Sequence, residues 1–106
     1  MSNYIDQESG LKRVGGSAAL YKKLLGKFIE GKYQEQLETL LAEGKIEDAT
    51  GMAHTIKGVA ANLSLTEVNR LALQVEQALK SGGDYASLVP QLHAATDATI
   101  EEINGL

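Results

Sequence analysis

The stretch KIEDATGMAHTIKGVAANL, residues 45–63, predicts the helix around which the rest of the chain is organised. Because a helix turns by about 100° per residue, its histidine, His54, points away from the apolar residues. Lys57 and Gly58 follow His54 by one turn on the same face. Gly51 precedes it by one turn on that face. The apolar residues recur at helical spacing on the opposite side: Ala49, Ala53, Ile56, Ala60 and Leu63.

Two helical patterns precede this stretch. A short one at residues 4–14 has Asp6 as its N-cap and is closed by two glycines. A longer one begins after Ser17 as N-cap and ends at Gly44, which suits the residue just beyond a helix. Gly31 lies inside the longer pattern and predicts a bend or short break, because glycine weakens a helix by about 1 kcal/mol relative to alanine.

Two more helices follow. Ser64 and Glu67 have the spacing of a capping box, in which the serine accepts from the N3 amide and the glutamate reaches back, so we expect a tight corner and a new helix. The last helix begins after Asp84, which places Pro90 inside it and predicts a kink, or at Ser87, which places Pro90 in the tolerated first turn. The sequence leaves both starts open.

These patterns predict an all-α protein, an antiparallel up-and-down four-helix bundle with a short additional N-terminal helix. The 106 residues, of which 43% are hydrophobic, suffice for one compact domain over residues 1–106. The formal net charge of −4 argues against nucleic acid as a partner. With no cysteine, the chain has no disulfides, thiol catalysis or zinc–thiolate sites. No apolar run has the length of a membrane span and the start lacks signal-peptide features, so we expect a soluble cytoplasmic protein.

The corner after residue 63 places a carboxylate near His54. Residues equidistant from the corner of an antiparallel hairpin lie at the same height, so His54 should lie level with Val75 and Glu76. Glu76, at the boundary of the core, would accept a hydrogen bond from Nδ1–H and leave Nε2 as the outward nucleophile. Lys57 would neutralise an anion arriving at Nε2. These are the requirements of a phosphoryl acceptor.

A simpler interpretation is that an exposed histidine is merely solvated. His93 keeps that interpretation, because no lysine or glycine is arranged around it. His54 differs because Lys57, Gly58 and the small residues Gly51 and Ala61 share its face. A metal or haem bundle is poorly supported, since such sites need several inward carboxylates or Glu-x-x-His pairs. The chain has no Gly-rich phosphate loop for ATP.

The segment AHTIKGVAANL, residues 53–63, resembles the signature of histidine-containing phosphotransfer (HPt) domains, whose motif His-x-x-Lys-Gly carries the phosphorylated histidine. Ser64 stands where family members often have glycine, and Glu76 where they carry Glu or Gln. The likeness covers nearly the whole chain. Further positions that resemble the family are Asp6, Gly10, Leu11, Arg13, Gly16, Tyr21, Leu24, Leu25, Phe28, Glu43, Gly44 and Val75.

The resemblance implies a phosphorelay intermediate in two-component signal transduction and not an enzyme that phosphorylates itself from ATP. His54 would accept a phosphoryl group from the aspartyl phosphate of a receiver domain and pass it to another receiver's aspartate. Lys57 would neutralise the phosphate and Glu76 would orient the imidazole. The implied partners are response-regulator receiver domains and a sensor or hybrid histidine kinase. No cofactor is expected on this chain, and Mg²⁺ is expected on the receiver.

The open face of the predicted helix would let a receiver approach closely, through Gly51, Gly58 and Ala61. Apolar residues of the first segment are candidate contacts at the rim of this face. These rim candidates are Ile5, Leu11 and Val14.

The alternative function is a non-catalytic helical adaptor that binds receiver or kinase domains without phosphotransfer.

Overall fold

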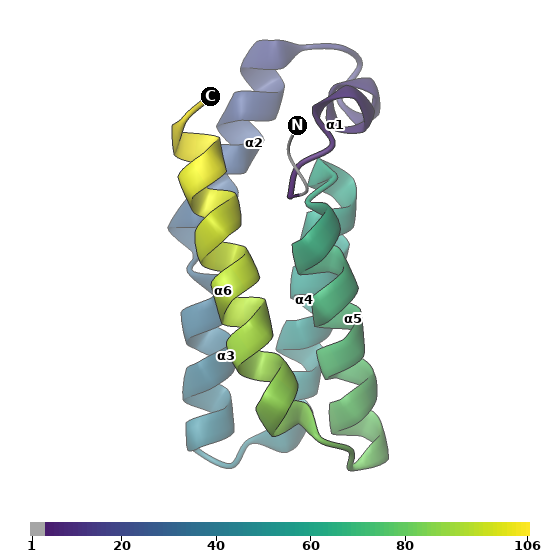
Figure 1. The fold of residues 1–106 in the computed structure, drawn as a ribbon, viewed down its shortest axis with the longest axis vertical. Coiled ribbons are helices and arrows are strands. Elements are labelled where there is room, and N and C mark those ends of the chain that lie inside the picture. Colours follow the sequence, from purple (N-terminus) through teal and green to yellow (C-terminus); the bar gives the residue numbers. More distant parts are fainter. Residues whose placement is uncertain (1–3) are drawn as a thin grey trace.

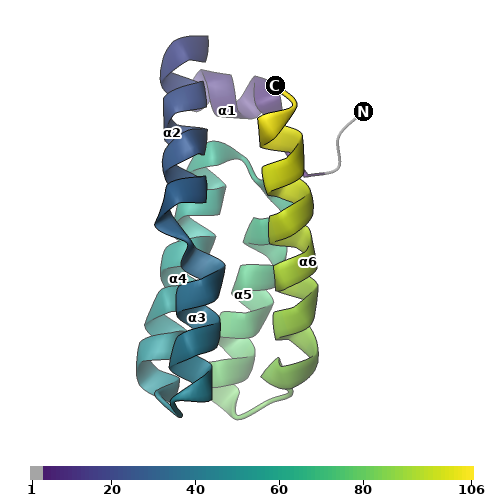
Figure 2. The ribbon, with the colours of Figure 1, turned by 90° about the vertical axis from the view of Figure 1, so that its left-hand side faces the viewer.

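The computed structural model describes residues 4–106, which form a bundle of helices with a long axis of 40 Å and two short axes of 22 Å. The predicted all-α up-and-down bundle is confirmed: α2 and α3 follow one another along one edge, and α4, α5 and α6 run alternately up and down beside them (Figures 1 and 2). The short α1 lies at one end. The helices are α1 (Gln7–Arg13), α2 (Ala18–Gly31), α3 (Tyr33–Ala42), α4 (Ile46–Leu63), α5 (Thr66–Ser81) and α6 (Tyr85–Asn104).

The first helices begin where the sequence predicts. Asp6 caps α1 by accepting from the Ser9 amide at 3.1 Å, and Ser17 caps α2 by accepting from the Leu20 amide at 3.2 Å. The expected interruption after α2 falls at Lys32, whose φ of 48° places it in the left-handed region. One long pattern is therefore divided into α2 and α3.

The predicted capping box at the α4–α5 corner is wrong. Ser64 adopts the left-handed conformation, with φ 56° and ψ 41°, and ends α4 by donating its amide to the carbonyls of Ala60 and Ala61. In this conformation its hydroxyl donates to Ser9 of α1 at 3.0 Å instead of capping α5. Glu67 pairs with Arg70, one turn further along α5, at 2.6 Å.

The segment before α1 is joined to the same corner. Ile5 and Leu65 form an isolated antiparallel bridge, and the amide of Thr66 donates to the carbonyl of Tyr4 at 2.9 Å. A start-of-helix amide of α5 is thus satisfied by the backbone of a distant segment. Ile5 is 4% exposed, so the expectation that it contacts a partner at the surface is wrong.

The last helix begins at the earlier of the two predicted starts. Asp84 is its N-cap and accepts from the Ser87 amide at 3.1 Å, so Pro90 lies inside α6. The alternative start at Ser87 is therefore wrong. The kink remains a prediction.

The core lies along the axis of the bundle and contains the predicted stripe of α4. Tyr21 is 3% exposed and its hydroxyl donates to the carbonyl of Leu63 at 2.6 Å, which ties α2 to the end of α4. Within residues 4–106, no helix is long and apolar enough to cross a membrane. Of the first residues, which lack signal-peptide features, residues 1–3 lie outside the described part of the chain. All five predicted stripe residues are buried: Ala49, Ala53, Ile56, Ala60 and Leu63.

Candidate functional site

His54 lies on the open face of α4. Its side chain is 66% exposed, whereas its neighbours Ala53 and Ile56 are buried. Gly51 and Gly58 are exposed on either side of it, and a Cβ added at either glycine would meet nothing within 4 Å outside its own stretch of helix. The surface around the imidazole is therefore open.

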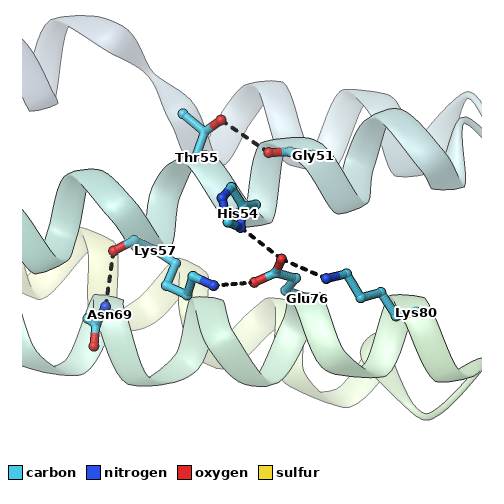
Figure 3. A network of polar contacts seen from close by, with 7 residues as sticks. All are labelled: Gly51, His54, Thr55, Lys57, Asn69, Glu76 and Lys80. Atoms are coloured by element: carbon cyan, nitrogen blue, oxygen red, sulfur yellow. Dashed lines mark hydrogen bonds and ion pairs between the residues drawn. The ribbon is translucent and has the colours of Figure 1, made fainter.

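The imidazole of His54 is hydrogen-bonded to a side chain of α5. His54 Nδ1 lies 2.9 Å from Oε2 of Glu76 (Figure 3). An ionised carboxylate only accepts hydrogen bonds, so Nδ1 must carry the proton that is donated. In the neutral ring, Nε2 then holds the lone pair. The hairpin geometry expected from the sequence does bring these two residues together.

Glu76 is buried, not at the core boundary as expected: its side chain is 4% exposed. Two lysines reach it, Lys57 with Nζ 2.8 Å from Oε1 and Lys80 with Nζ 3.2 Å from Oε2 (Figure 3). The hydrogen bond from Lys57 is the main cause that lowers the pKa of Glu76 to about 2, and those from Lys80 and His54 add to it against the opposing effect of burial. The carboxylate is therefore ionised throughout the neutral range.

Lys57 has a different partner from the one expected for it. The sequence suggested a cation that faces an incoming anion at Nε2, but in this structure its ammonium group rests on Glu76. Its side chain is 27% exposed, so it lies at the edge of the open face and not in the core.

Two contacts of the site were missed from the sequence. Lys80 follows Glu76 by four residues, and an i, i+4 acid–base pair on one helix was a signal that was available. Asn69 of α5 donates from Nδ2 to the carbonyl of Lys57 at 3.0 Å, which fixes α5 against α4 beside Gly58 (Figure 3). No local pattern indicates this second contact, because it joins two helices.

The remaining candidates lie at the α1 end of the site. Ala61 is half-buried and lines a shallow hollow of about 200 Å³, together with Arg13 of α1 and Asn69. Leu11 and Val14 are half-buried and pack against the core, so only part of each side chain is accessible to a partner.

His93 is not simply solvated. Its Nδ1 is hydrogen-bonded to Oε2 of Glu38 on α3, and its Nε2 lies 3.3 Å from Asp97. The hydrogen bond to Glu38 is the main cause that raises the pKa of His93. The sequence missed this pair because its members are far apart in the chain. Residues 4–106 contain no group of three or more His, Cys, Asp or Glu side chains suited to holding a metal ion.

The fold and the site together define a helical-bundle protein that presents one histidine, oriented by a buried carboxylate, on an open helix face. Comparison with family models matches residues 24–104 to the Hpt domain. The chain belongs to the Hpt domain family. Neither the curated proteins nor the solved structures gave a match.

Membership implies a histidine phosphotransfer role in two-component signalling. Hpt domains are phosphoryl carriers and not autonomous kinases, and they interact with receiver domains and histidine kinases.

Proposed function

We propose that His54 is the phosphoryl acceptor of this chain, and that it carries the group between the aspartates of two receiver domains. The observation that carries the proposal is the pairing of His54 Nδ1 with the buried carboxylate of Glu76, which leaves Nε2 as the free nitrogen of a side chain that is 66% exposed. His93, the other histidine, has both ring nitrogens beside carboxylates.

The transfer is a direct exchange of one bond to phosphorus. The lone pair of His54 Nε2 attacks the phosphorus of an aspartyl phosphate, the N–P bond forms, and the P–O bond breaks with its electron pair leaving on the aspartate. The proton stays on Nδ1, so the phosphorylated ring carries a positive charge. The N–P bond keeps a high transfer potential, so the same step runs in reverse toward a second receiver.

Glu76 supports both sides of this exchange. Because its pKa is about 2, it does not take the Nδ1 proton at neutral pH, and its charge instead stabilises the positive ring that forms on phosphorylation. It also fixes the direction in which Nε2 points. The role is that of an orienting group beneath the nucleophile.

Lys57 is the cation nearest to the nucleophile on the same helix. It follows His54 by three residues, and its Nζ lies within 2.8 Å of the carboxylate that also holds the imidazole. We assign it the neutralisation of the phosphoryl oxygens, which requires its ammonium group to move from Glu76 toward Nε2.

The glycines on the open face support a docking role. Among residues 4–106, no atom outside the helix's own nearby backbone lies within 4 Å of a Cβ added at Gly51 or Gly58, so the absence of a side chain there favours close approach by another molecule. Ala61 extends this small-residue surface toward α1. The receiver would bring its aspartate and Mg²⁺, and this chain would bind no cofactor of its own.

Incubation with a receiver domain carrying a radiolabelled phosphoryl group tests the proposal. We expect label on the chain that is acid-labile and alkali-stable, as a phosphohistidine is, and that is lost in His54→Gln. His93→Gln is the matched control and should keep the label. A wild-type chain that binds phosphorylated receivers but never takes the label would contradict the proposal and favour the adaptor.

A further inference from the structure

Three groups converge on Glu76: the imidazole of His54 and the ammonium groups of Lys57 and Lys80, whose two positive charges exceed the single negative charge of the carboxylate. Lys57 Nζ lies 2.8 Å from Oε1, while His54 Nδ1 and Lys80 Nζ lie 2.9 Å and 3.2 Å from Oε2 (Figure 3). Either lysine alone supplies the one positive charge that balances this carboxylate. One of the two lysines is therefore free to act elsewhere without leaving the carboxylate unpaired.

The two lysines differ in position. Lys57 is on α4, one turn from the nucleophile, and the proposed function draws it to the phosphoryl group. Lys80 is on α5, one turn after Glu76, and its side chain is 64% exposed. It shares Oε2 with His54, so it holds the oxygen that orients the ring, whereas Lys57 holds the other oxygen.

Departure of Lys57 would matter if Lys80 were absent. Glu76 would then be a carboxylate with a side chain 4% exposed and no lysine beside it. Burial without a cation raises the pKa of a carboxylate and favours its neutral form. A neutral or displaced Glu76 would no longer stabilise a positively charged imidazole.

We propose that Lys57 and Lys80 work as a handover pair: Lys80 is a positioning residue that keeps Glu76 ionised and in place while Lys57 turns to the phosphoryl group. Lys80 makes and breaks no covalent bond and passes no proton. The movement of Lys57 toward a phosphoryl group rests on the proposed function, whereas the ion pair between Lys80 and Glu76 does not.

The first experiment needs no phosphoryl group. Lys57→Met abolishes the contact of Lys57 with Glu76, which the proposal expects phosphorylation to break. ¹⁵N NMR of the imidazole then reports which nitrogen of His54 carries the proton. We expect the Nδ1–H form to persist in Lys57→Met and to be lost in the double variant Lys57→Met/Lys80→Met. If Lys57→Met alone loses that form as fully as the double variant, Lys80 does not hold Glu76 and the proposal is overturned.

The second experiment measures transfer from a phosphorylated receiver. Lys80→Met should lower the rate at saturating receiver by about tenfold while leaving the half-saturating concentration unchanged, and Lys80→Arg should restore the rate to within about twofold. Lys23→Met, which removes the same charge from an exposed position on α2, is the matched control and should have no effect. An unchanged saturating rate, or an effect on half-saturation alone, would make Lys80 a docking residue at most and overturn the handover.

These experiments distinguish failure of the proposed function from failure of the handover pair. If the wild-type chain takes no phosphoryl group from a receiver or from phosphoramidate, the proposed function fails, and the NMR comparison of the lysine variants still decides whether Lys80 holds Glu76. If the wild-type chain is phosphorylated normally and Lys80→Met behaves like it, only the handover fails.

Discussion

Glu76 is a charged residue that is nonetheless buried, with a side chain only 4% exposed, and its contacts explain why it can be. Its side chain lies under the exposed imidazole, and two lysines reach it from the solvent side of α4 and α5. Their charge offsets the cost of removing a carboxylate from water. The same arrangement orients the proposed nucleophile, so one residue contributes to both folding and function.

Replacing Glu76 with glutamine separates its charge from its shape. Glu76→Gln keeps an oxygen that can accept from His54 Nδ1 but leaves a positively charged ring without a counter-charge, so we expect phosphoryl transfer to slow by about tenfold. The measurement is the rate of label transfer, with circular dichroism as the check that the bundle is folded. An unchanged rate would remove the charge of Glu76 from the mechanism.

The pH dependence of stability follows from the same residue. The pKa of Glu76 falls from 4.5 to about 2 on folding, so its stabilisation is fully present above pH 4.5 and is lost as the pH falls through about 2. We expect this loss to be on the order of 1–2 kcal/mol after solvent screening of the lysines. Urea unfolding at pH 2 and pH 6 should show it in the wild-type chain, whereas Glu76→Gln should lack that share of the pH dependence.

Among the elements, the corner between α4 and α5 depends on Ser64 in a left-handed conformation, with φ 56°. Glycine adopts this region without strain, whereas a β-branched residue does so at a cost of about 1–2 kcal/mol. Serine already carries part of this strain, so we expect Ser64→Val to add only the difference, about 1 kcal/mol, together with the loss of the hydroxyl contact to Ser9. Ser64→Gly should stay within about 0.5 kcal/mol of wild type, because relief of strain offsets the loss of that contact. Equal unfolding midpoints for the two variants would contradict this account.

The contact between α3 and α6 carries its own pH dependence. The hydrogen bond between His93 and Glu38 raises the pKa of His93. The stabilisation is therefore full below the pKa of His93 in the unfolded chain, near 6.5, and is lost as the pH rises through its higher pKa in the folded chain. Because His93 is 48% exposed, we expect a small effect, about 0.5 kcal/mol. His93→Gln should therefore destabilise the chain more at pH 5.5 than at pH 9 in denaturant unfolding. The opposite order would show that the pair does not stabilise the folded state.

For the whole molecule, sequence patterns predict the parts of the structure that depend on local spacing. The buried stripe of α4 and the caps at Asp6 and Ser17 follow from such patterns. The position of Glu76 level with His54 follows from where the chain turns between α4 and α5. The capping box failed because Ser64 can either cap the next helix or end the previous one, and contact with α1 decides between them. The His93–Glu38 pair joins residues 55 apart, so only the assembled bundle reveals it.

Gly58 provides a test in which stability and function respond in opposite directions. It lies inside α4, and a Cβ there would meet nothing within 4 Å outside its own stretch of helix, so the fold gives no reason for glycine. Gly58→Ala should raise the free energy of unfolding by about 0.5–1 kcal/mol, since alanine favours the helix. Transfer should nevertheless slow, because the added methyl group stands on the face that the receiver approaches.

The matched control for that test is Gly26→Ala, inside α2, where an added Cβ also meets nothing within 4 Å. It should stabilise the bundle by a similar amount and leave transfer unchanged. Thermal unfolding and receiver-dependent label transfer, measured on both variants, check the pair of expectations. If Gly58→Ala transfers as fast as Gly26→Ala, the open face around His54 does not require glycine, and the receiver must approach the imidazole from another side of the histidine.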